Sequence, residues 1–314
     1  MVKIGLYLPV YGGWFRPPVK EEEEPPTYAY MKQIAIEAEK IGLDSLWIPD
    51  HMLNPMKGDK APALEAWTLA TAITEATHRV IVTHTVLCEA FRYPAVLAKQ
   101  TATLHEISQG RFWLSLGAGW YKREYEAYGL PFYEHDERVD RTREAIQIIK
   151  GLWKEDSVTF KGKYYSINNG ALEPKPKPMP PLWYGGVSEA SRELVAEEFD
   201  VWLMRRCRPE EAQENIADMK KRLAKKGRSQ MEYAIPAFAF IRGTDEEAKR
   251  HVEQITEGSD GQRKLIIDSG FAGSPETIAQ TIRQLESMGI NHVLLQLSPT
   301  LAELPRVKQV LALL

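Results

Sequence analysis

Short apolar runs alternate with longer amphipathic segments along almost the whole chain. The apolar runs are rich in β-branched, leucine and aromatic residues, which is typical of buried parallel strands. They cover residues 3–9, 45–49, 79–87, 111–117, 182–184, 201–204, 233–242 and 292–297. The segments between them repeat apolar residues at helical spacing. Eight strands that are each followed by a helix predict a (β/α)8 TIM barrel, with a doubly wound α/β sheet as the alternative.

Two segments interrupt this alternation, and we expect them to be insertions after strands 4 and 7 of a single domain spanning residues 1–314. In the first, residues 154–180, the stretch VTFKGKYY predicts a hairpin with Lys161 and Gly162 at its turn, followed by a proline-rich connector. The second, residues 256–273, contains Gly258, Gly261 and Gly270 and is a candidate mobile lid.

Composition excludes several classes of function. The 314 residues include 40 basic and 43 acidic side chains, for a net charge of −3, so we expect no nucleic-acid partner. Cys88 and Cys207 are far apart and outside any metal-binding spacing, so we expect neither a disulfide framework nor a metal site. No apolar run approaches the length of a membrane span or signal peptide. The simplest location is the cytoplasm.

The most informative stretch runs from Arg111 to Arg138. An apolar strand ends in Gly117-Ala118-Gly119 and continues into a loop crowded with aromatic residues, beginning with Trp120. In a parallel α/β fold, ligands bind at the carboxyl ends of the strands. This loop is therefore a candidate wall of a pocket for a flat, phosphorylated cofactor.

The sequence Gly185-Gly186-Val187-Ser188 lies between a strand and a helix. Glycines let backbone N–H groups approach an anion, and the start of a helix favours negative charge, so the turn is a candidate phosphate site. A plain turn with Ser188 as the helix N-cap accounts for the same residues.

Polar residues also follow the second and third predicted strands. His51 could act as an acid or base, or it could be a structural loop histidine. Glu89 ends the third strand and would reach the same face. His135, Asp136 and Glu137 are more simply explained as helix-start residues than as metal ligands.

Several longer motifs carry a resemblance to a known family. They are KIGLYLP, GLDSLWIPDHML, the block from FRYPAVLAKQ to WYKREYEAYGLPF, HDERVDRTREAIQIIKGLW, PPLWYGGVSEASRELVAEEFDVW and GSPETIAQTIRQLESMGINHVLLQ. With these motifs the chain resembles the bacterial luciferase-like superfamily of flavin- and F420-dependent oxidoreductases, over nearly its whole length. The resemblance implies a TIM barrel that binds reduced FMN or F420 at the carboxyl ends of its strands.

The resemblance also implies roles for individual residues. Leu87 and Cys88 would form a bulge against the cofactor ring, and Ser115 and Gly117 would line the ring's edge. Arg138 would lie beside the phosphate or ribityl chain, and residues 185–188 would hold the phosphate. His51, Glu89 and Trp120 are the candidate catalytic residues. Much of the substrate pocket would come from Trp14, Trp120, Tyr125, Phe238 and Phe240.

Four departures from the FMN enzymes bear on the cofactor and substrate. Ser115 stands where that branch often has Asn, and Val139 where it often has Tyr. Pro236 and Phe238 replace the Arg and His that the sulfonate enzymes carry on strand seven, and Leu64 lies where those enzymes have an active-site cysteine. A sulfonate substrate is therefore not expected.

We favour a two-component monooxygenase that takes reduced FMN from a separate flavin reductase and uses O2 to oxidise a small, fairly apolar substrate. An F420-dependent enzyme that transfers hydride and a non-catalytic flavin-binding barrel are the alternatives. We also expect a homo-oligomer, either a dimer or a tetramer.

Overall fold

The computed structural model of the protein describes residues 1–16, 19, 20, 22 and 24–314. Parallel strands form one sheet in the order β3-β2-β1-β13-β10-β9-β8-β5-β4. Their bounds are β1 Lys3–Tyr7, β2 Ser45–Ile48, β3 Ile81–His84, β4 Leu87–Cys88, β5 Leu114–Gly117, β8 Leu182–Gly185, β9 Val201–Leu203, β10 Glu232–Phe238 and β13 His292–Gln296. A parallel bridge between Val82 in β3 and Phe112 just before β5 brings the two edges together. The TIM-barrel prediction is confirmed, and the doubly wound alternative is wrong.

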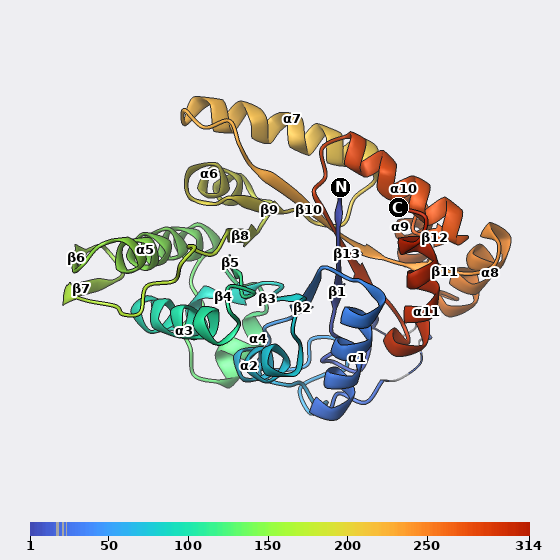
Figure 1. Ribbon diagram of the computed structural model, residues 1–314, viewed down its shortest axis with the longest axis horizontal. Helices are drawn as coiled ribbons and strands as arrows, with labels where there is room; N and C mark the ends of the chain where they lie inside the picture. The colour runs from blue at the N-terminus through green and yellow to red at the C-terminus, as the bar shows by residue number, and fades with distance from the viewer. Residues whose placement is uncertain (17–18, 21, 23) are drawn as a thin grey trace.

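Helices surround the strands (Figure 1). Those of the outer ring are α1 Tyr28–Ile41, α2 Ala66–Ala76, α3 Pro94–Ile107, α5 His135–Lys154, α6 Glu189–Glu198, α7 Pro209–Lys225, α10 Pro275–Ser287 and α11 Thr300–Leu311. Successive helices pack side by side from α1 to α7, and α11 packs on both α10 and α1. Each buries one apolar face against the sheet, as Met31, Ile34, Ala35 and Ala38 of α1 do.

Large side chains fill the interior of the barrel. Trp47 from β2 and Trp183 from β8 meet with ring centroids 4.7 Å apart, and Trp113 stacks on Trp183 at 5.4 Å. His292 at the start of β13 packs against Trp183 at 4.6 Å. Since the interior is a packed core and not a pore, space for a ligand must lie at the ends of the strands.

The third predicted strand is not continuous. It divides into β3 and β4, and the peptide between them, Thr85–Val86, is cis. β3 pairs only with β2 in register, while β4 pairs with β5, so the two pieces together make one barrel strand. The expected bulge therefore lies at Thr85 and Val86, one residue before Leu87.

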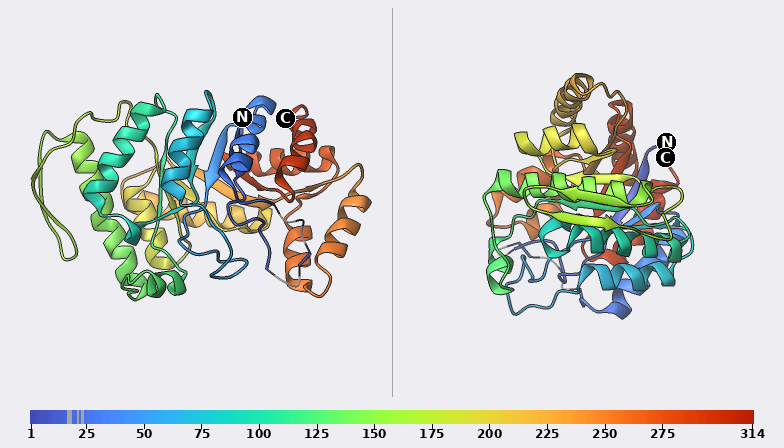
Figure 2. Two further views of the ribbon diagram at one scale, coloured as in Figure 1. Left: turned by 90° about the horizontal axis from the view of Figure 1, so that it is seen from below. Right: turned by 90° about the vertical axis from the view of Figure 1, so that its left-hand side faces the viewer.

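The first insertion is a two-stranded antiparallel hairpin that projects beside α5, away from the barrel (Figure 2). Its strands are β6 Val158–Lys161 and β7 Ser166–Gly170. The predicted hairpin was right in kind but wrong in extent. Gly162 donates its N–H to the carbonyl of Tyr165, so the turn lies after Lys161 and the second strand begins where we expected the hairpin to end.

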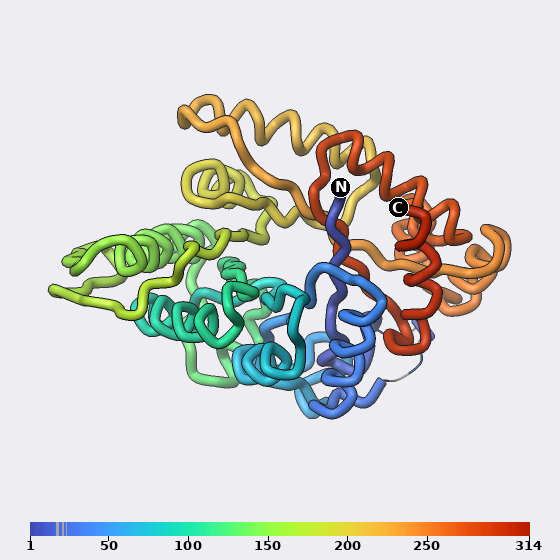
Figure 3. Tube along the Cα trace, viewed as in Figure 1, coloured from blue at the N-terminus to red at the C-terminus, as the bar shows by residue number. Residues whose placement is uncertain are grey.

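The second insertion contains two helices and a short strand, and is not a simple loop. The predicted seventh strand stops at Phe238, and its last part forms β11 Phe240–Ile241, which pairs with β12 Ala272–Gly273. Helices α8 Asp245–Ile255 and α9 Asp260–Asp268 precede β12. The two insertions lie at opposite ends of the molecule (Figure 3). Within the described ranges, no helix is long and apolar enough to cross a membrane.

Candidate active site

A cavity of about 340 Å³ opens at the carboxyl ends of β2, β4, β5 and β8. This volume lies at the lower end of the range for small-molecule sites, about 300–1,000 Å³. Most of the predicted site residues line it: His51, Leu87, Cys88, Gly117, Trp120, Arg138, Gly185, Gly186, Val187 and Ser188. The sequence motifs therefore converge on one site.

Two glycines allow the bulge to enter this cavity wall. A Cβ atom on Gly117 would lie 2.5 Å from Val86 Cγ2, and one on Gly185 would lie 3.0 Å from Val86 Cγ1. The contact at Gly117 is too close for a Cβ atom, and the one at Gly185 is tighter than most, so Val86 fits in its place because both residues lack a side chain. The glycines of the two predicted motifs shape the cavity floor together.

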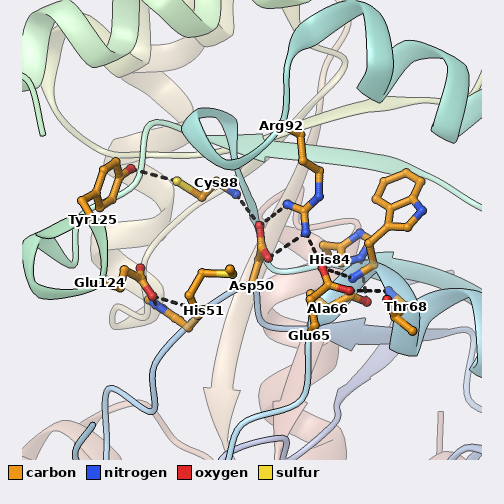
Figure 4. A network of polar contacts seen from close by, with 12 residues as sticks. Asp50, His51, Glu65, Ala66, Thr68, His84, Cys88, Arg92, Glu124 and Tyr125 are labelled. Carbon is orange, nitrogen blue, oxygen red and sulfur yellow. Dashed lines mark hydrogen bonds and ion pairs between the residues drawn. The ribbon is translucent and has the colours of Figure 1, made fainter. Parts of the chain in front are cut away.

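Asp50 holds the bulge in position from the end of β2 (Figure 4). Its Oδ2 accepts the backbone N–H of Cys88 at 2.8 Å, and its carboxylate accepts two N–H groups of Arg92, at 2.7 and 3.2 Å. Arg92 also donates to Glu65 at 2.7 Å. The buried charge of Asp50 is therefore fully paired, and the paired carboxylate orients β4 toward the cavity.

The thiol of Cys88 is buried and paired. Its Sγ lies 2.8 Å from the hydroxyl of Tyr125, and burial raises the pKa of Cys88 to about 12. A thiol with this pKa stays protonated near neutral pH, so Cys88 is no nucleophile. It serves as part of the cavity wall. Tyr125, an expected pocket residue, lies behind Cys88 and does not line the cavity.

His51 forms a carboxylate–histidine pair with Glu124, which comes from the short helix α4 Lys122–Ala127 (Figure 4). His51 Nδ1 lies 2.9 Å from Glu124 Oε1, and the backbone N–H of Met52 donates to Oε2 at 2.8 Å. Because an ionised carboxylate can only accept, Nδ1 carries the proton, which leaves Nε2 as the atom that can exchange a proton with a ligand. The rings of Tyr11, Trp120 and Tyr121 surround the imidazole at 5.4–6.0 Å.

Hydrogen-bond donors gather at the far end of the cavity. Ser188 is the N-cap of α6 and accepts the N–H of Ser191 at 3.2 Å. His135 at the start of α5 lies 2.6 Å from the Ser188 hydroxyl, and both residues line the cavity. Arg138, one turn further along α5, donates to the carbonyl of Ala118 at 3.2 Å. Two helix starts and a guanidinium therefore create a positive potential here.

Two predicted residues lie outside the cavity lining. Ser115 lies two positions before Gly117 on β5 and so faces the same side, one layer deeper. Its buried hydroxyl has no hydrogen-bond partner in the described part of the chain. Glu89 points toward the first insertion, where the hydroxyl of Tyr165 donates to it, and burial raises its pKa to about 7. The position of Glu89 outside the cavity lining does not support a catalytic role.

The expected aromatic residues divide between two places. Trp120 lines the cavity, with 57% of its surface exposed. Trp14, Phe238 and Phe240 lie instead around the ends of β10 and β13, where Phe15 packs on Phe238 at 4.5 Å.

Sequence reasoning assigned no site role to three titratable residues that line the cavity: Asp50, Glu124 and His135. Asp50 directly precedes the candidate His51, and His135 was interpreted as part of a helix start. Glu124 lies 73 positions from the histidine that it contacts, and no local pattern links the two. The available signal was that all three follow carboxyl ends of predicted strands.

Two larger cavities are poorer candidates for a redox site. One, of about 600 Å³, is lined by Lys3, Trp113, Asp200 and Glu232 and lies at the amino end of the barrel. That end of a TIM barrel contributes stability and not catalysis. The other, of about 460 Å³, lies on the outside of the barrel beside α8 and α11.

The comparison with known families agrees with the site. The family model described as luciferase-like monooxygenase matches residues 12–271. This chain belongs to the luciferase-like monooxygenase family. The family resemblance predicted from the sequence is thereby confirmed.

Relatives within this family differ in cofactor. An FMNH2-dependent dimethylsulfone monooxygenase of Pseudomonas putida is 32% identical over 219 residues, which are 68% of this chain and 60% of that protein. An F420-dependent glucose-6-phosphate dehydrogenase of Amycolatopsis mediterranei is 39% identical over 153 residues, 48% of this chain and 45% of that protein. The matches thus span about half of the lengths of these curated relatives.

A solved structure shows the same fold. An F420-dependent secondary alcohol dehydrogenase, in complex with an F420-acetone adduct, superposes with a TM-score of 0.82 at 24% identity, and the match covers 98% of each chain. This likeness shows the fold and leaves the choice between FMN and F420 open.

Proposed function

We propose that this chain is an oxidoreductase that uses reduced FMN and O2 to oxidise a small organic substrate, with a separate flavin reductase supplying the reduced FMN. One observation carries the proposal. A single cavity at the carboxyl ends of the strands has anion-binding groups at one end and the His51–Glu124 pair at the other. This arrangement suits a cofactor with a phosphate tail and a redox-active ring. The family relative that depends on FMNH2 supports the same choice.

The residues present suit a flavin mononucleotide. The backbone from Gly185 to Ser188, with His135 and Arg138, would hold the phosphate, and Val86 and Leu87 would support one face of the ring. Ser115 offers a buried hydroxyl without a partner, which a polar ring edge could satisfy. When bound, the reduced flavin would supply the electrons that activate O2.

The chain itself would orient the reactants and move protons. Glu124 fixes the tautomer of His51, so that Nε2 is available at the cavity to accept a proton or, once protonated, to donate one. Trp120, Tyr121 and Tyr11 surround the imidazole and limit the access of water. Exclusion of water is important because it protects reactive species from hydrolysis.

A second candidate is hydride transfer with F420. The 39% identity to an F420-dependent dehydrogenase favours it, as does Ser115 at a position where FMN enzymes often have Asn. Both hypotheses use the same cavity and the same anion-binding end. They differ in the cofactor bound and in whether O2 is consumed.

The test is an anaerobic titration of the protein with FMN, reduced FMN and F420, followed by oxygen-electrode assays with dimethyl sulfone and other small organic compounds. The proposal expects the tightest binding for reduced FMN and substrate-dependent O2 uptake. Preferential binding of F420 without O2 uptake would transfer the assignment to the second candidate.

His51 provides a sharper test of the chemistry. His51→Gln removes the proton-exchanging atom and should lower turnover by about 100-fold, since general acid–base catalysis contributes roughly 10²–10⁴-fold. Reduced-flavin affinity should stay within about threefold. Glu124→Gln is the matched variant, because it keeps the hydrogen bond to the ring and removes the charge. Normal turnover in both variants would make the pair structural.

A further inference from the structure

Arg206 lies just beyond the end of β9, at the mouth of the barrel. Its guanidinium carbon is 3.6 Å from the centroid of the Phe238 ring, and its Nη2 donates to the side-chain oxygen of Gln296. Phe238 ends β10 and Gln296 ends β13, the next strand in the sheet. The guanidinium is thus held by two neighbouring strands and lies over their carboxyl ends.

The charge of Arg206 has no partner in the described part of the chain. No carboxylate oxygen there lies within 4.0 Å of it, and its Nε is buried without an acceptor. Arg206 is partly buried, and two other partly buried arginines are compensated within the described residues. Arg92 pairs with Asp50 and Glu65, and Arg111, which has no carboxylate, donates to three backbone carbonyls and a hydroxyl.

An arginine whose N–H donors lack acceptors can bind an anion. A guanidinium has five N–H donors in a planar fork, and among the described residues those of Arg206 have one acceptor, the side-chain oxygen of Gln296. Burial lowers the pKa of Arg206 to about 10, which still leaves the group charged at neutral pH. A buried cation is costly unless an anion or hydrogen bonds compensate it. A carboxylate or sulfinate would accept two parallel hydrogen bonds from the fork.

The position of Arg206 connects it to the cavity. Its charge acts on the hydroxyl of Tyr7 at the end of β1. That hydroxyl accepts a hydrogen bond of 2.8 Å from Thr85, which lines the cavity. The Tyr7–Thr85 pair therefore links the surroundings of Arg206 to the cavity wall. Phe15 and Phe238 provide an apolar surface next to the guanidinium.

We propose that Arg206 binds the acidic group of the substrate, so that the substrate is a small organic acid whose carbon skeleton extends from Arg206 toward the cavity. This inference rests on the proposed function, because it assigns the substrate class to the same active site. It goes beyond the known relatives, since dimethyl sulfone, named in one of them, is a neutral molecule.

The test compares matched acids and amides. Butanoate with butanamide, phenylacetate with phenylacetamide, and methanesulfinate with dimethyl sulfone are titrated by calorimetry into the anaerobic protein, with and without reduced FMN. We expect at least one acid to bind ten times more tightly than its neutral partner. Equal affinities in every pair, or tighter binding of dimethyl sulfone than of any acid, would overturn the proposal.

Two variants separate a binding role from a structural one. Arg206→Gln should abolish the preference for the acid, while the affinity for neutral partners and the melting temperature change little. Arg205→Gln is the matched control, because Arg205 is the exposed neighbour on the same loop, and it should keep the preference. Equal behaviour of the two variants would contradict the proposal.

The same measurements distinguish a failure of the FMN proposal from a failure of the substrate-acid proposal. Failure of the wild-type protein to bind reduced FMN would remove the FMN assignment, whereas the acid preference of the cofactor-free protein would still decide the role of Arg206. If Arg206→Gln weakened reduced-FMN binding more than tenfold, the arginine would belong to the cofactor site, and the substrate-acid proposal would fall.

Discussion

The two halves of the barrel mouth are built in different ways. The half formed by β2, β4, β5 and β8 contains the cavity, two glycines in its floor and the paired carboxylates of Asp50 and Glu124. The half formed by β1, β9, β10 and β13 is closed by aromatic rings and contains Arg206, which has no carboxylate partner in the described part of the chain. The first half has an open cavity with Arg138 at its wall, whereas the guanidinium of the second half lies against an aromatic ring.

This difference indicates that the two halves have different roles, one in binding the cofactor and the other in binding the substrate. In the cavity half, Asp50 pairs with Arg92, and Glu124 holds His51 and the backbone of Met52 by hydrogen bonds, so the walls keep their shape before a cofactor arrives. Such preorganisation reduces the cost of binding. In the aromatic half, the negative charge that balances Arg206 must come from a bound ligand. We therefore expect cofactor affinity to depend on the first half and substrate selection on the second.

The largest expected effect comes from Gly117→Ala. The added methyl group would meet Val86 at 2.5 Å and force the bulge into the cavity. Overpacking of this kind costs about 1–3 kcal/mol of stability, and reduced-FMN affinity should fall at least 100-fold, as measured by anaerobic fluorescence titration. Gly261→Ala is the control, because nothing lies near its Cβ position. Unchanged affinity in Gly117→Ala would show that the bulge does not shape the cofactor site.

A smaller effect is expected from Ser188→Asp. Aspartate can still cap α6, so the helix should remain intact, but its negative charge would face a bound phosphate. FMN affinity should fall at least tenfold, while riboflavin, which has no phosphate, should bind as it does to the wild type. An equal loss for both ligands would move the phosphate away from residues 185–188.

Glu89 lies just outside the lining of the cavity. Its pKa, about 7 in the folded protein, is above the usual value, because burial disfavours the charged form. A raised carboxyl pKa means that the stability which Glu89 contributes is present below about pH 4.5 and is lost as the pH rises toward 7. Glu89→Gln should therefore raise the unfolding free energy by about 1 kcal/mol at pH 8 and by less at pH 5, as measured by urea unfolding. A large fall in turnover would instead restore the catalytic assignment of Glu89.

The smallest effect tests the aromatic half. Phe238→Leu removes the ring that faces Arg206, and cation–π contacts contribute about 0.5–1 kcal/mol at partly exposed sites. The affinity for the preferred organic acid should fall about threefold, and reduced-FMN affinity should not change. Phe240→Leu is the control, since no contact between Phe240 and the guanidinium exists. A loss of FMN affinity in Phe238→Leu would break the division between the halves.

Most of the fold was predictable from the sequence, because strand and helix periodicities alternate regularly and parallel strands bury both faces. The errors occurred where the chain departs from that regularity. The breaks at Thr85 and Ala239 interrupt runs that remain apolar, so composition did not reveal them. The turn of the first insertion was misplaced because Lys161 and Gly162 resemble a tight turn, whereas the chain continues to Tyr165 before it reverses.

The candidate site was predictable where its residues follow strands in recognisable motifs, as Gly117 and Gly185 do. It was not predictable where the partners come from distant segments. The pairing of His51 with Glu124 depends on the position of α4, and the isolation of Arg206 depends on the absence, in the described part of the chain, of a carboxylate within 4.0 Å of its guanidinium. Neither property belongs to a local stretch of sequence.

The burial of the Cys88 thiol has a practical consequence. An enzyme that handles O2 risks releasing hydrogen peroxide, which attacks thiolates far faster than thiols. The buried, protonated sulfur of Cys88 lies directly at the cavity wall and yet offers peroxide little to attack. Repeated turnover should therefore leave this sulfur unoxidised, without the help of a cellular reductant.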